Sequence, residues 1–170
     1  MKNLQNLKLK NSSIGKIGIN ISGDLEDEEI VDRAKIVEKS GVKIVWVGEF
    51  EGFKDPLDVA EIIANSTSLF IGFGVLSPLK RECSEIKKGI KRLQNKFGNR
   101  FLVGIGAGKF RNAKEALNKT VECIKELRYE FTVVAGCSSP KITHISSNLA
   151  DGILFNYVHP RYLQWIKRYV

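Results

Sequence analysis

Three alternating glycines and a lysine follow a short apolar run in the middle of the chain. Gly104, Gly106 and Gly108 come just before Lys109. A strand that ends in bare backbone leaves room for a phosphate or a ring, because no Cβ stands in the way. A P-loop would need a glycine five positions before the Gly-Lys pair and Ser or Thr after it, and a dinucleotide fingerprint would need its third glycine at Lys109. The stretch therefore predicts a ligand-binding strand end of another kind.

Apolar runs alternate with amphipathic stretches six times along the chain. Six such units predict a parallel sheet with right-handed crossovers, either an open doubly wound sheet or a (β/α) barrel. A barrel normally takes eight units and ~250 residues. The expected strands are 14–21, 42–47, 68–75, 100–105, 131–135 and 152–158; the expected helices are 25–40, a segment beginning at 56, 82–97, 112–129, 140–149 and 160–170.

Two helix starts carry clear signals. Asp24 precedes a run of acidic residues, so it is the expected N-cap of the first helix, where the positive end of the helix dipole favours negative charge. Asp55 followed by Pro56 predicts the start of the second helix, with an N-cap and a proline at the first helical position.

In both architectures, ligands bind at the carboxyl ends of the strands. Glycine-rich or polar segments fall at all six expected ends, which indicates a site on that face. These segments are 22–23, 48–49, 72–77, 104–109, 136–139 and Asn156. The segment 136–139 leads into a helix at Pro140, and the free N–H groups of a helix N-terminus bind anions.

The composition is that of a soluble globular protein, with 43% hydrophobic and 27% charged residues among 170. We expect a polar N-terminal segment (1–13) and one domain (14–170). No apolar run approaches the roughly 20 residues of a membrane span, and the N-terminus lacks the apolar core of a signal peptide. Cys83, Cys123 and Cys137 lie far apart, which favours reduced thiols in the cytoplasm over disulfides or a zinc site.

The formal net charge of +8 comes from lysines and arginines spread through every segment, with mild clusters at 87–92 and 161–168. Such a spread is typical of solvated helix faces, and nucleic-acid binding is the minority interpretation. A positive field would also attract polyanionic small ligands.

Several strand ends resemble the bacterial-luciferase-like barrels. GFGVLSP (72–78) resembles their third-strand motif, RFLVGIGAGK (100–109) their fourth strand, and SSPKITHISSNLADGILFN (138–156) their fifth-to-sixth segment. VHP (158–160) is similar to a turn in the deazaflavin-dependent methylene-tetrahydromethanopterin reductases, and VKIVWVGEF (42–50) lies where that branch has a strand ending in Thr-Asp-His. The motifs follow one another in unbroken order.

The resemblance implies an α/β fold that is an incomplete TIM-type barrel of about six parallel strands. It also implies a site for FMN or the 8-hydroxy-5-deazaflavin coenzyme and a hydride-transfer reaction. In the family, a non-proline cis peptide in the third-strand bulge backs the cofactor ring, and here it would fall at Gly74–Val75. The phosphate contacts would fall on Gly136, Ser138 and Ser139. The remaining residues expected at the cofactor are Ser77, Gly106, Gly108 and Asn156.

This chain also departs from the family pattern. Relatives have eight strands, whereas this chain stops after the sixth unit, which leaves sheet edges for chain termini or another subunit to cover. Glu49 and Lys109 are the catalytic candidates, but Phe50 stands where relatives carry His, and Lys109 where an acid is common. The alternative is therefore a non-catalytic member that serves as subunit or partner of a full-length relative. A homo-oligomer is also expected.

Overall fold

The computed structural model describes residues 17–156 and 158–170, in which six βα units follow one another. The expected N-terminal segment 1–13, and residues 14–16 of the expected first strand, lie outside the described residues. The strands are β1 (Gly18–Asn20), β2 (Ile44–Val47), β3 (Phe70–Phe73), β4 (Phe101–Ile105), β5 (Thr132–Cys137) and β6 (Gly152–Phe155). The helices are α1 (Asp27–Lys39), α2 (Pro56–Ser66), α3 (Cys83–Phe97), α4 (Ala113–Leu127), α5 (Pro140–Ser147) and α6 (Pro160–Ile166), followed by the 3₁₀ helix η1 (Lys167–Tyr169).

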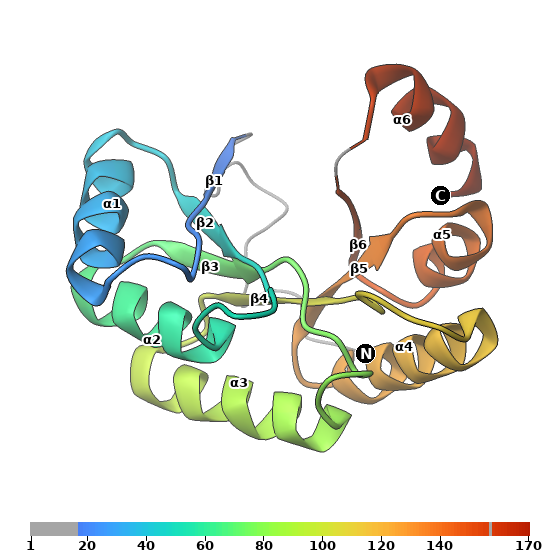
Figure 1. Cartoon of the computed structure of the whole chain (residues 1–170), viewed down its shortest axis with the longest axis horizontal. Helices are drawn as coiled ribbons and strands as arrows, with labels where there is room; N and C mark the ends of the chain where they lie inside the picture. The colour runs from blue at the N-terminus through green and yellow to red at the C-terminus, as the bar shows by residue number, and fades with distance from the viewer. Residues whose placement is uncertain (1–16, 157) are drawn as a thin grey trace.

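The six strands form one parallel sheet in the order of the sequence, β1-β2-β3-β4-β5-β6. The sheet curves into a half-barrel with the helices along its outer side (Figure 1). A doubly wound sheet would reverse its strand order and carry helices on both faces. The expected incomplete TIM-type barrel with six parallel strands is therefore confirmed. Within the described residues, β1 and β6 each pair with one neighbour only.

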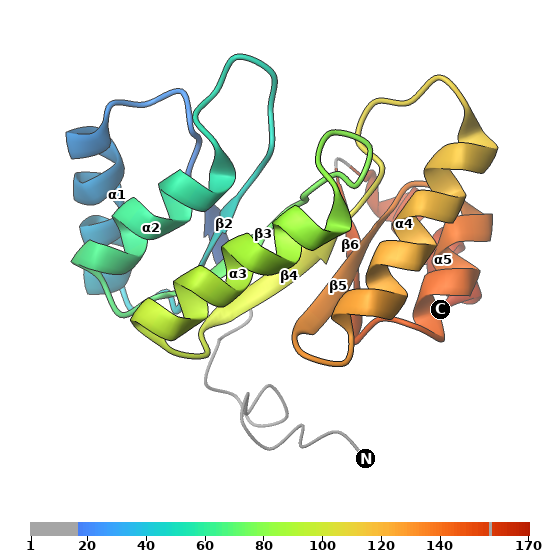
Figure 2. The ribbon, with the colours of Figure 1, turned by 90° about the horizontal axis from the view of Figure 1, so that it is seen from below.

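The hydrophobic core lies between the outer face of the sheet and the helices. Alternate strand residues such as Val45, Ile71 and Val103 point outward and are fully buried against helix residues such as Ile63 and Ile90. Figure 2 shows α2, α3 and α4 lying across this face of the strands. Since a strand alternates its side chains, the residues between these point to the inner face, and the site is expected at the carboxyl ends of the strands.

The two helix starts predicted from the sequence had different outcomes. Asp55 caps α2 as expected, because its Oδ1 accepts a hydrogen bond from the N–H of Leu57 at 2.8 Å. The expected cap at Asp24 is wrong. The N-cap of α1 is Glu26, two residues further along than expected. The Glu26 side chain accepts a hydrogen bond from the backbone N–H of Glu29, and the Glu29 side chain accepts one from the backbone N–H of Glu26, which makes a capping box.

Candidate functional site

The third strand departs from regular pairing at the carboxyl end of the sheet. Gly72 of β3 pairs with Leu102 of β4, but Leu76 then pairs with Ile105, so the third strand holds one residue more than the fourth over this stretch. The extra residue is accommodated at Gly74–Val75, where the peptide bond is cis. The expected non-proline cis bond at this position is confirmed.

Three glycines on neighbouring strands make room for this bulge. A Cβ at Gly106 would lie 2.7 Å from Cγ2 of Val75, and a Cβ at Gly136 would lie 2.8 Å from its Cγ1. A Cβ at Gly104 would overlap the carbonyl oxygen of Phe73. These separations are below van der Waals contact, so a larger residue at any of the three would displace the bulge. Gly104 and Gly106, which are expected to leave room for a ligand, thus also make room for the protein's own backbone and Val75.

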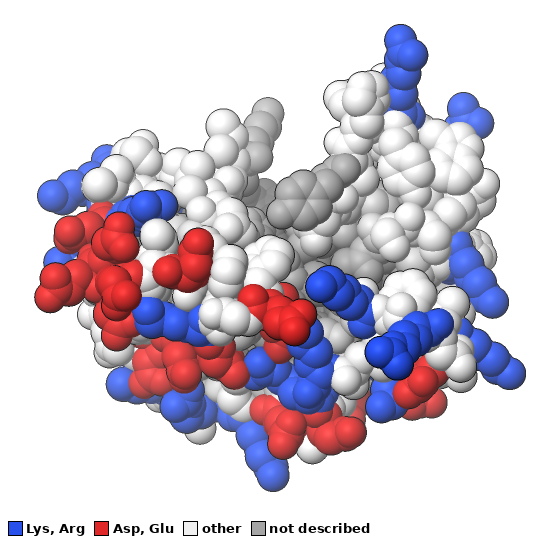
Figure 3. Space-filling view, viewed as in Figure 1, with Lys and Arg blue, Asp and Glu red and all other residues white. Residues whose placement is uncertain are grey.

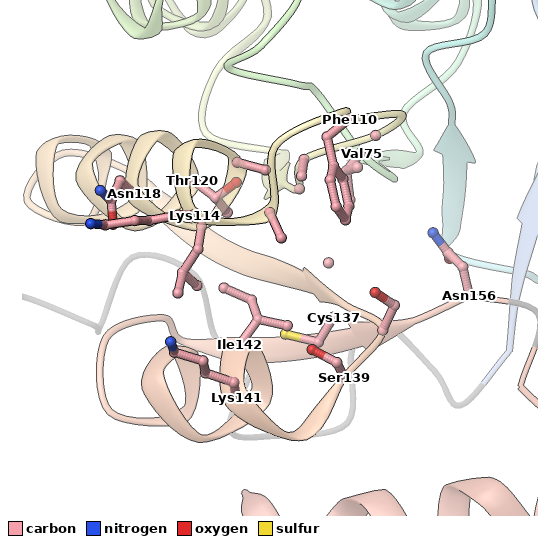
Figure 4. Close-up of a pocket in the computed structure, with 18 residues that line it drawn as sticks. Val75, Phe110, Lys114, Asn118, Thr120, Cys137, Ser139, Lys141, Ile142 and Asn156 are labelled. Carbon is pink, nitrogen blue, oxygen red and sulfur yellow. The ribbon is translucent and has the colours of Figure 1, made fainter.

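A cavity of about 680 Å³ begins beside Val75 and extends outward between α4 and α5 (Figure 4). This volume falls in the range of small-molecule sites. Its walls come from the bulge, the loops after β4 and β5, the first half of α4 and the start of α5. The expected site residues that line it are Val75, Gly106, Gly108, Gly136, Ser138, Ser139 and Asn156.

Ser77 and Glu49 lie behind the bulge, outside the cavity lining. The buried Ser77 hydroxyl donates to the carbonyl oxygen of Ala107 at 2.7 Å, and the Ser77 N–H donates to Oε2 of Glu49 at 2.9 Å. The other carboxylate oxygen of Glu49, Oε1, accepts from Arg81 Nε at 2.9 Å and Nη2 at 2.6 Å. These hydrogen bonds tie together the loops that follow β2, β3 and β4.

Arg81 also pairs with Asp55, the N-cap of α2, at 2.9 Å between Nη1 and Oδ2. The side chains of Glu49 and Arg81 are only 6% and 19% exposed. Burial alone would lower the pKa of Arg81, but the hydrogen bonds and negative charges of Glu49 and Asp55 raise it. Both carboxylate oxygens of Glu49, a catalytic candidate from the sequence, are therefore engaged in holding the bulge and its loops.

Lys109, the other catalytic candidate, lies on the loop after β4 and outside the cavity lining. Its side chain is 95% exposed, and its Nζ lies 3.7 Å from Oε2 of Glu51, which is also largely exposed. The structure therefore does not bring Glu49 and Lys109 together around one reacting centre.

The N-terminus of α5 faces the cavity without a capping side chain. Ser139 holds the N-cap position, but its hydroxyl makes no capping hydrogen bond. The preceding carbonyl, that of Ser138, accepts a 2.8 Å hydrogen bond from the hydroxyl of Tyr162 on α6. The first-turn N–H groups of an uncapped helix are donors that an anion can use.

Two lysines that sequence reasoning missed line the outer part of the cavity. Lys114 and Lys141 are the second residues of α4 and α5, and neither side chain makes an ion pair with any residue that the structure describes. The helix dipole disfavours a cation in the first turn. The sequence signal that could have identified these two residues is a lysine in the first turn of two successive helices, where the helix dipole disfavours it.

The expectation of three reduced thiols is wrong for two of the cysteines. Cys83 at the start of α3 and Cys123 on α4 form a disulfide with 5.5 Å between their Cα atoms. They are 40 residues apart in sequence, but the βα repeat places their helices next to each other on the sheet. Cys137 is free and buried, and burial raises its pKa against the opposite effect of the Ser146 and Thr143 hydroxyls.

Two classes of feature are absent from residues 17–156 and 158–170. These residues form no group of three or more His, Cys, Asp and Glu side chains placed to hold a metal ion. None of their helices has the length and apolar character needed to cross a membrane.

No family model matches the sequence. Two curated relatives are 5,10-methylenetetrahydromethanopterin reductases. The one from Methanolobus tindarius is 22% identical over 167 residues, which cover 78% of this chain and 51% of the relative. The one from Archaeoglobus fulgidus is 22% identical over 180 residues, which cover 86% and 54%. The chain therefore spans about half the length of the curated relatives that it matches.

Solved structures share the fold over most of the chain. The coenzyme F420 dependent tetrahydromethanopterin reductase from Methanopyrus kandleri matches with a TM-score of 0.76 and 17% identity, covering 90% of this chain and 59% of that one. The monooxygenase RslO1 from Streptomyces bottropensis matches with a TM-score of 0.77 and 15% identity, covering 89% and 63%. A Baeyer-Villiger monooxygenase from Pseudomonas putida, solved in complex with FMN, matches with a TM-score of 0.51 and 11% identity, covering 78% and 60%.

The fold and these matches agree on the kind of protein that the chain resembles. The chain has the fold of luciferase-like (β/α) proteins, and the proteins that it resembles include reductases and monooxygenases. Two of its curated sequence matches are methylenetetrahydromethanopterin reductases.

Proposed function

We propose that this chain binds a flavin-type cofactor, FMN or the 8-hydroxy-5-deazaflavin coenzyme, in the cavity beside Val75 and that it takes part in hydride transfer. The observation that carries this proposal is the Gly74–Val75 bulge, which presents the Val75 side chain at the inner end of a cavity whose wall includes an uncapped helix N-terminus. The reductase named for coenzyme F420 and the monooxygenase solved with FMN support a cofactor of this class.

Each lining residue would have a definite role. Val75 would support one face of the ring, Gly106 and Gly108 would let the ring approach the backbone, and Asn156 would lie at its edge. Gly136, Ser138 and Ser139 would bind the phosphate together with the first-turn N–H groups of α5. The cofactor supplies the redox-active ring, and the protein orients it. Gly74, Ser77 and Glu49 would hold the bulge, and Lys109 would contribute only a screened positive charge.

A titration with FMN and riboflavin tests the phosphate site. We expect Ser139→Asp to retain the fold, because Asp is a good N-cap, and to weaken FMN binding about tenfold or more through repulsion of the phosphate. Riboflavin has the same ring without the phosphate, so its affinity should not fall. Ser147→Asp at the other end of α5 is the control with the same added charge. A wild-type chain that binds neither FMN nor the deazaflavin coenzyme rules out the cofactor proposal.

A second candidate is a non-catalytic member of the family that acts as a subunit or partner of a full-length relative. The positions of Glu49 and Lys109 favour it, because one is committed to Arg81 and the other extends into solvent. This candidate predicts that the chain performs no hydride transfer with a bound cofactor. It also predicts that the chain co-purifies with a larger luciferase-like protein. Catalytic reduction of the bound cofactor by the isolated chain when a hydride donor is added, with the donor oxidised in equal amount, would contradict it.

Three further parts of the proposal concern the molecule as a whole. Residues 14–170 would act as one luciferase-like domain, the chain would form a homo-oligomer or bind the larger partner, and it would work in the cytoplasm. Light scattering during size-exclusion chromatography tests whether the chain forms a homo-oligomer, since a mass of 19.1 kDa is that of a monomer. Fractionation of cells that produce the protein tests its location.

A further inference from the structure

The cavity has an outer half that the proposed cofactor site does not use. The expected cofactor residues lie around the bulge and the two loops, whereas the outer half lies between the helices α4 and α5 (Figure 4). We propose that this outer half is a separate subsite for a small amphipathic acid, with an apolar body between the helices and an acidic group between Lys114 and Lys141.

The walls of the outer half are apolar. Ala113, Ala116 and Leu117 of α4 and Ile142 of α5 form them. An apolar cavity lined by fixed helix residues favours burial of a hydrocarbon or aromatic body.

One polar group within these walls lacks a partner. Thr120 of α4 lines the cavity with 1% of its surface exposed, and its hydroxyl makes no hydrogen bond with any residue that the structure describes. Buried polar groups are normally paired, so the Thr120 hydroxyl is an unused hydrogen-bonding group within this wall.

The charge at the outer end is positive and unbalanced. Lys114 and Lys141 reach this end from facing helices, with the amide of Asn118 beside Lys114 (Figure 4). Among the described residues, no Asp or Glu lines the cavity and neither lysine has an ion-pair partner. Two unpaired cations at the end of an apolar cavity complement a ligand with an anionic end.

Two fluorescent probes with the same rings test this subsite. Anilinonaphthalenesulfonate carries an acidic group on an apolar body, and phenylnaphthylamine lacks that group. We expect the wild-type chain to bind the sulfonate about tenfold or more tightly than the neutral probe, which corresponds to one or two charge-assisted hydrogen bonds. The double variant Lys114→Gln/Lys141→Gln should lose this preference and keep its affinity for the neutral probe. The matched control is Lys88→Gln/Lys125→Gln, which removes the same charge from exposed positions outside the cavity lining.

Protection of Cys137 from alkylation tests whether the probe binds in the cavity. Cys137 lines the cavity and is the free thiol of a chain whose other two cysteines form the disulfide. At a sulfonate concentration near its Kd for the wild type, we expect the probe to slow iodoacetamide modification of Cys137 in the wild type and in the control variant, and to slow it much less in the Lys114→Gln/Lys141→Gln variant.

Three results would overturn the assignment: no binding of the sulfonate, an unchanged preference in the Lys114→Gln/Lys141→Gln variant, or an unchanged rate of Cys137 alkylation when the probe is bound. Neither probe contains a flavin, and the key variants differ from Ser139→Asp. A failure of the subsite, seen with the two probes, can therefore be distinguished from a failure of the cofactor site, seen in the FMN titration.

Discussion

Thr120 and Thr143 form a matched pair of buried hydroxyls on the two helices beside the cavity. The Thr143 hydroxyl donates to the carbonyl of Ser139 at 2.8 Å, whereas the Thr120 hydroxyl has no partner among the described residues. An unpaired buried polar group costs ~1–3 kcal/mol, and a made hydrogen bond contributes ~1 kcal/mol.

We therefore expect opposite effects when each of these threonines is replaced by valine. Thr120→Val should raise the free energy of unfolding by ~1 kcal/mol, because it removes an unpaired polar group, and Thr143→Val should lower it by ~1 kcal/mol. Urea unfolding of the two variants measures both changes. A loss of stability in Thr120→Val equal to that in Thr143→Val would show that the Thr120 hydroxyl is already satisfied.

At the scale of elements, the pair of Arg81 and Glu49 joins the loops that follow β2 and β3. Replacing Arg81 by Met would leave the nearly buried carboxylate of Glu49 without its cation, which should cost ~3 kcal/mol of unfolding free energy. Arg92→Met is the control, because Arg92 is 57% exposed and its ion pairs with Asp58 and Glu61 should be worth under ~1 kcal/mol. Urea unfolding distinguishes the two; equal losses would mean that the Glu49 pair adds nothing beyond a surface pair.

The Cys83–Cys123 disulfide joins α3 to α4 across 40 residues of sequence. Closing a loop of this length restricts the unfolded chain and corresponds to ~4 kcal/mol of stability. We expect Cys83→Ser to lower the free energy of unfolding by ~2–4 kcal/mol and Cys137→Ser to change it much less. Thiol titration of the unfolded wild type should find one free thiol before reduction and three afterwards. Three thiols before reduction would contradict the bond.

The elements themselves were predictable because each depends on local pattern. The β-branched run 42–47 predicts β2, and Asp55-Pro56 predicts the start of α2. The start of α1 was misplaced, because the reciprocal capping box of Glu26 and Glu29 competes with the simpler signal at Asp24.

The missed parts of the candidate site depend on contacts between distant segments. Glu49 follows a strand end as expected, yet its role is set by Arg81, which lies 32 residues further along the chain. The partner of Cys83 is likewise fixed by the packing of α3 beside α4, which no spacing in the sequence reveals. The cis bond at Gly74–Val75 was predicted through the family motif, since nothing in those two residue types alone requires it.

At the scale of the whole molecule, several of the cations behind the charge of +8 lie against acidic side chains in the part of the chain that the structure describes. Lys87 and Lys91 both contact the carboxylate of Glu130 at 2.5 Å, and their hydrogen bonds lower the pKa of that group. Arg92 and Lys96 likewise share the carboxylate of Glu61. Figure 3 shows acidic and basic side chains intermixed over the left and lower parts of the visible face. The basic cluster 87–92 noted in the sequence is thus partly neutralised by acids from other elements.

Binding to duplex DNA at several salt concentrations tests this neutralisation. The slope of log affinity against log salt reports ~0.9 per phosphate contacted, and we expect a slope shallower than about −3 for the wild type. Glu61→Gln/Glu130→Gln frees Lys87, Lys91 and Lys96 and leaves Arg92 only its pair with Asp58, so the slope should be steeper by roughly 2–3. Glu28→Gln/Asp32→Asn on α1 makes the same change in net charge at exposed positions away from those cations and should leave the slope near the wild-type value. A wild-type slope of about −6 or steeper would instead mean that the surface engages many phosphates despite its ion pairs, and nucleic acid would become a partner of the chain.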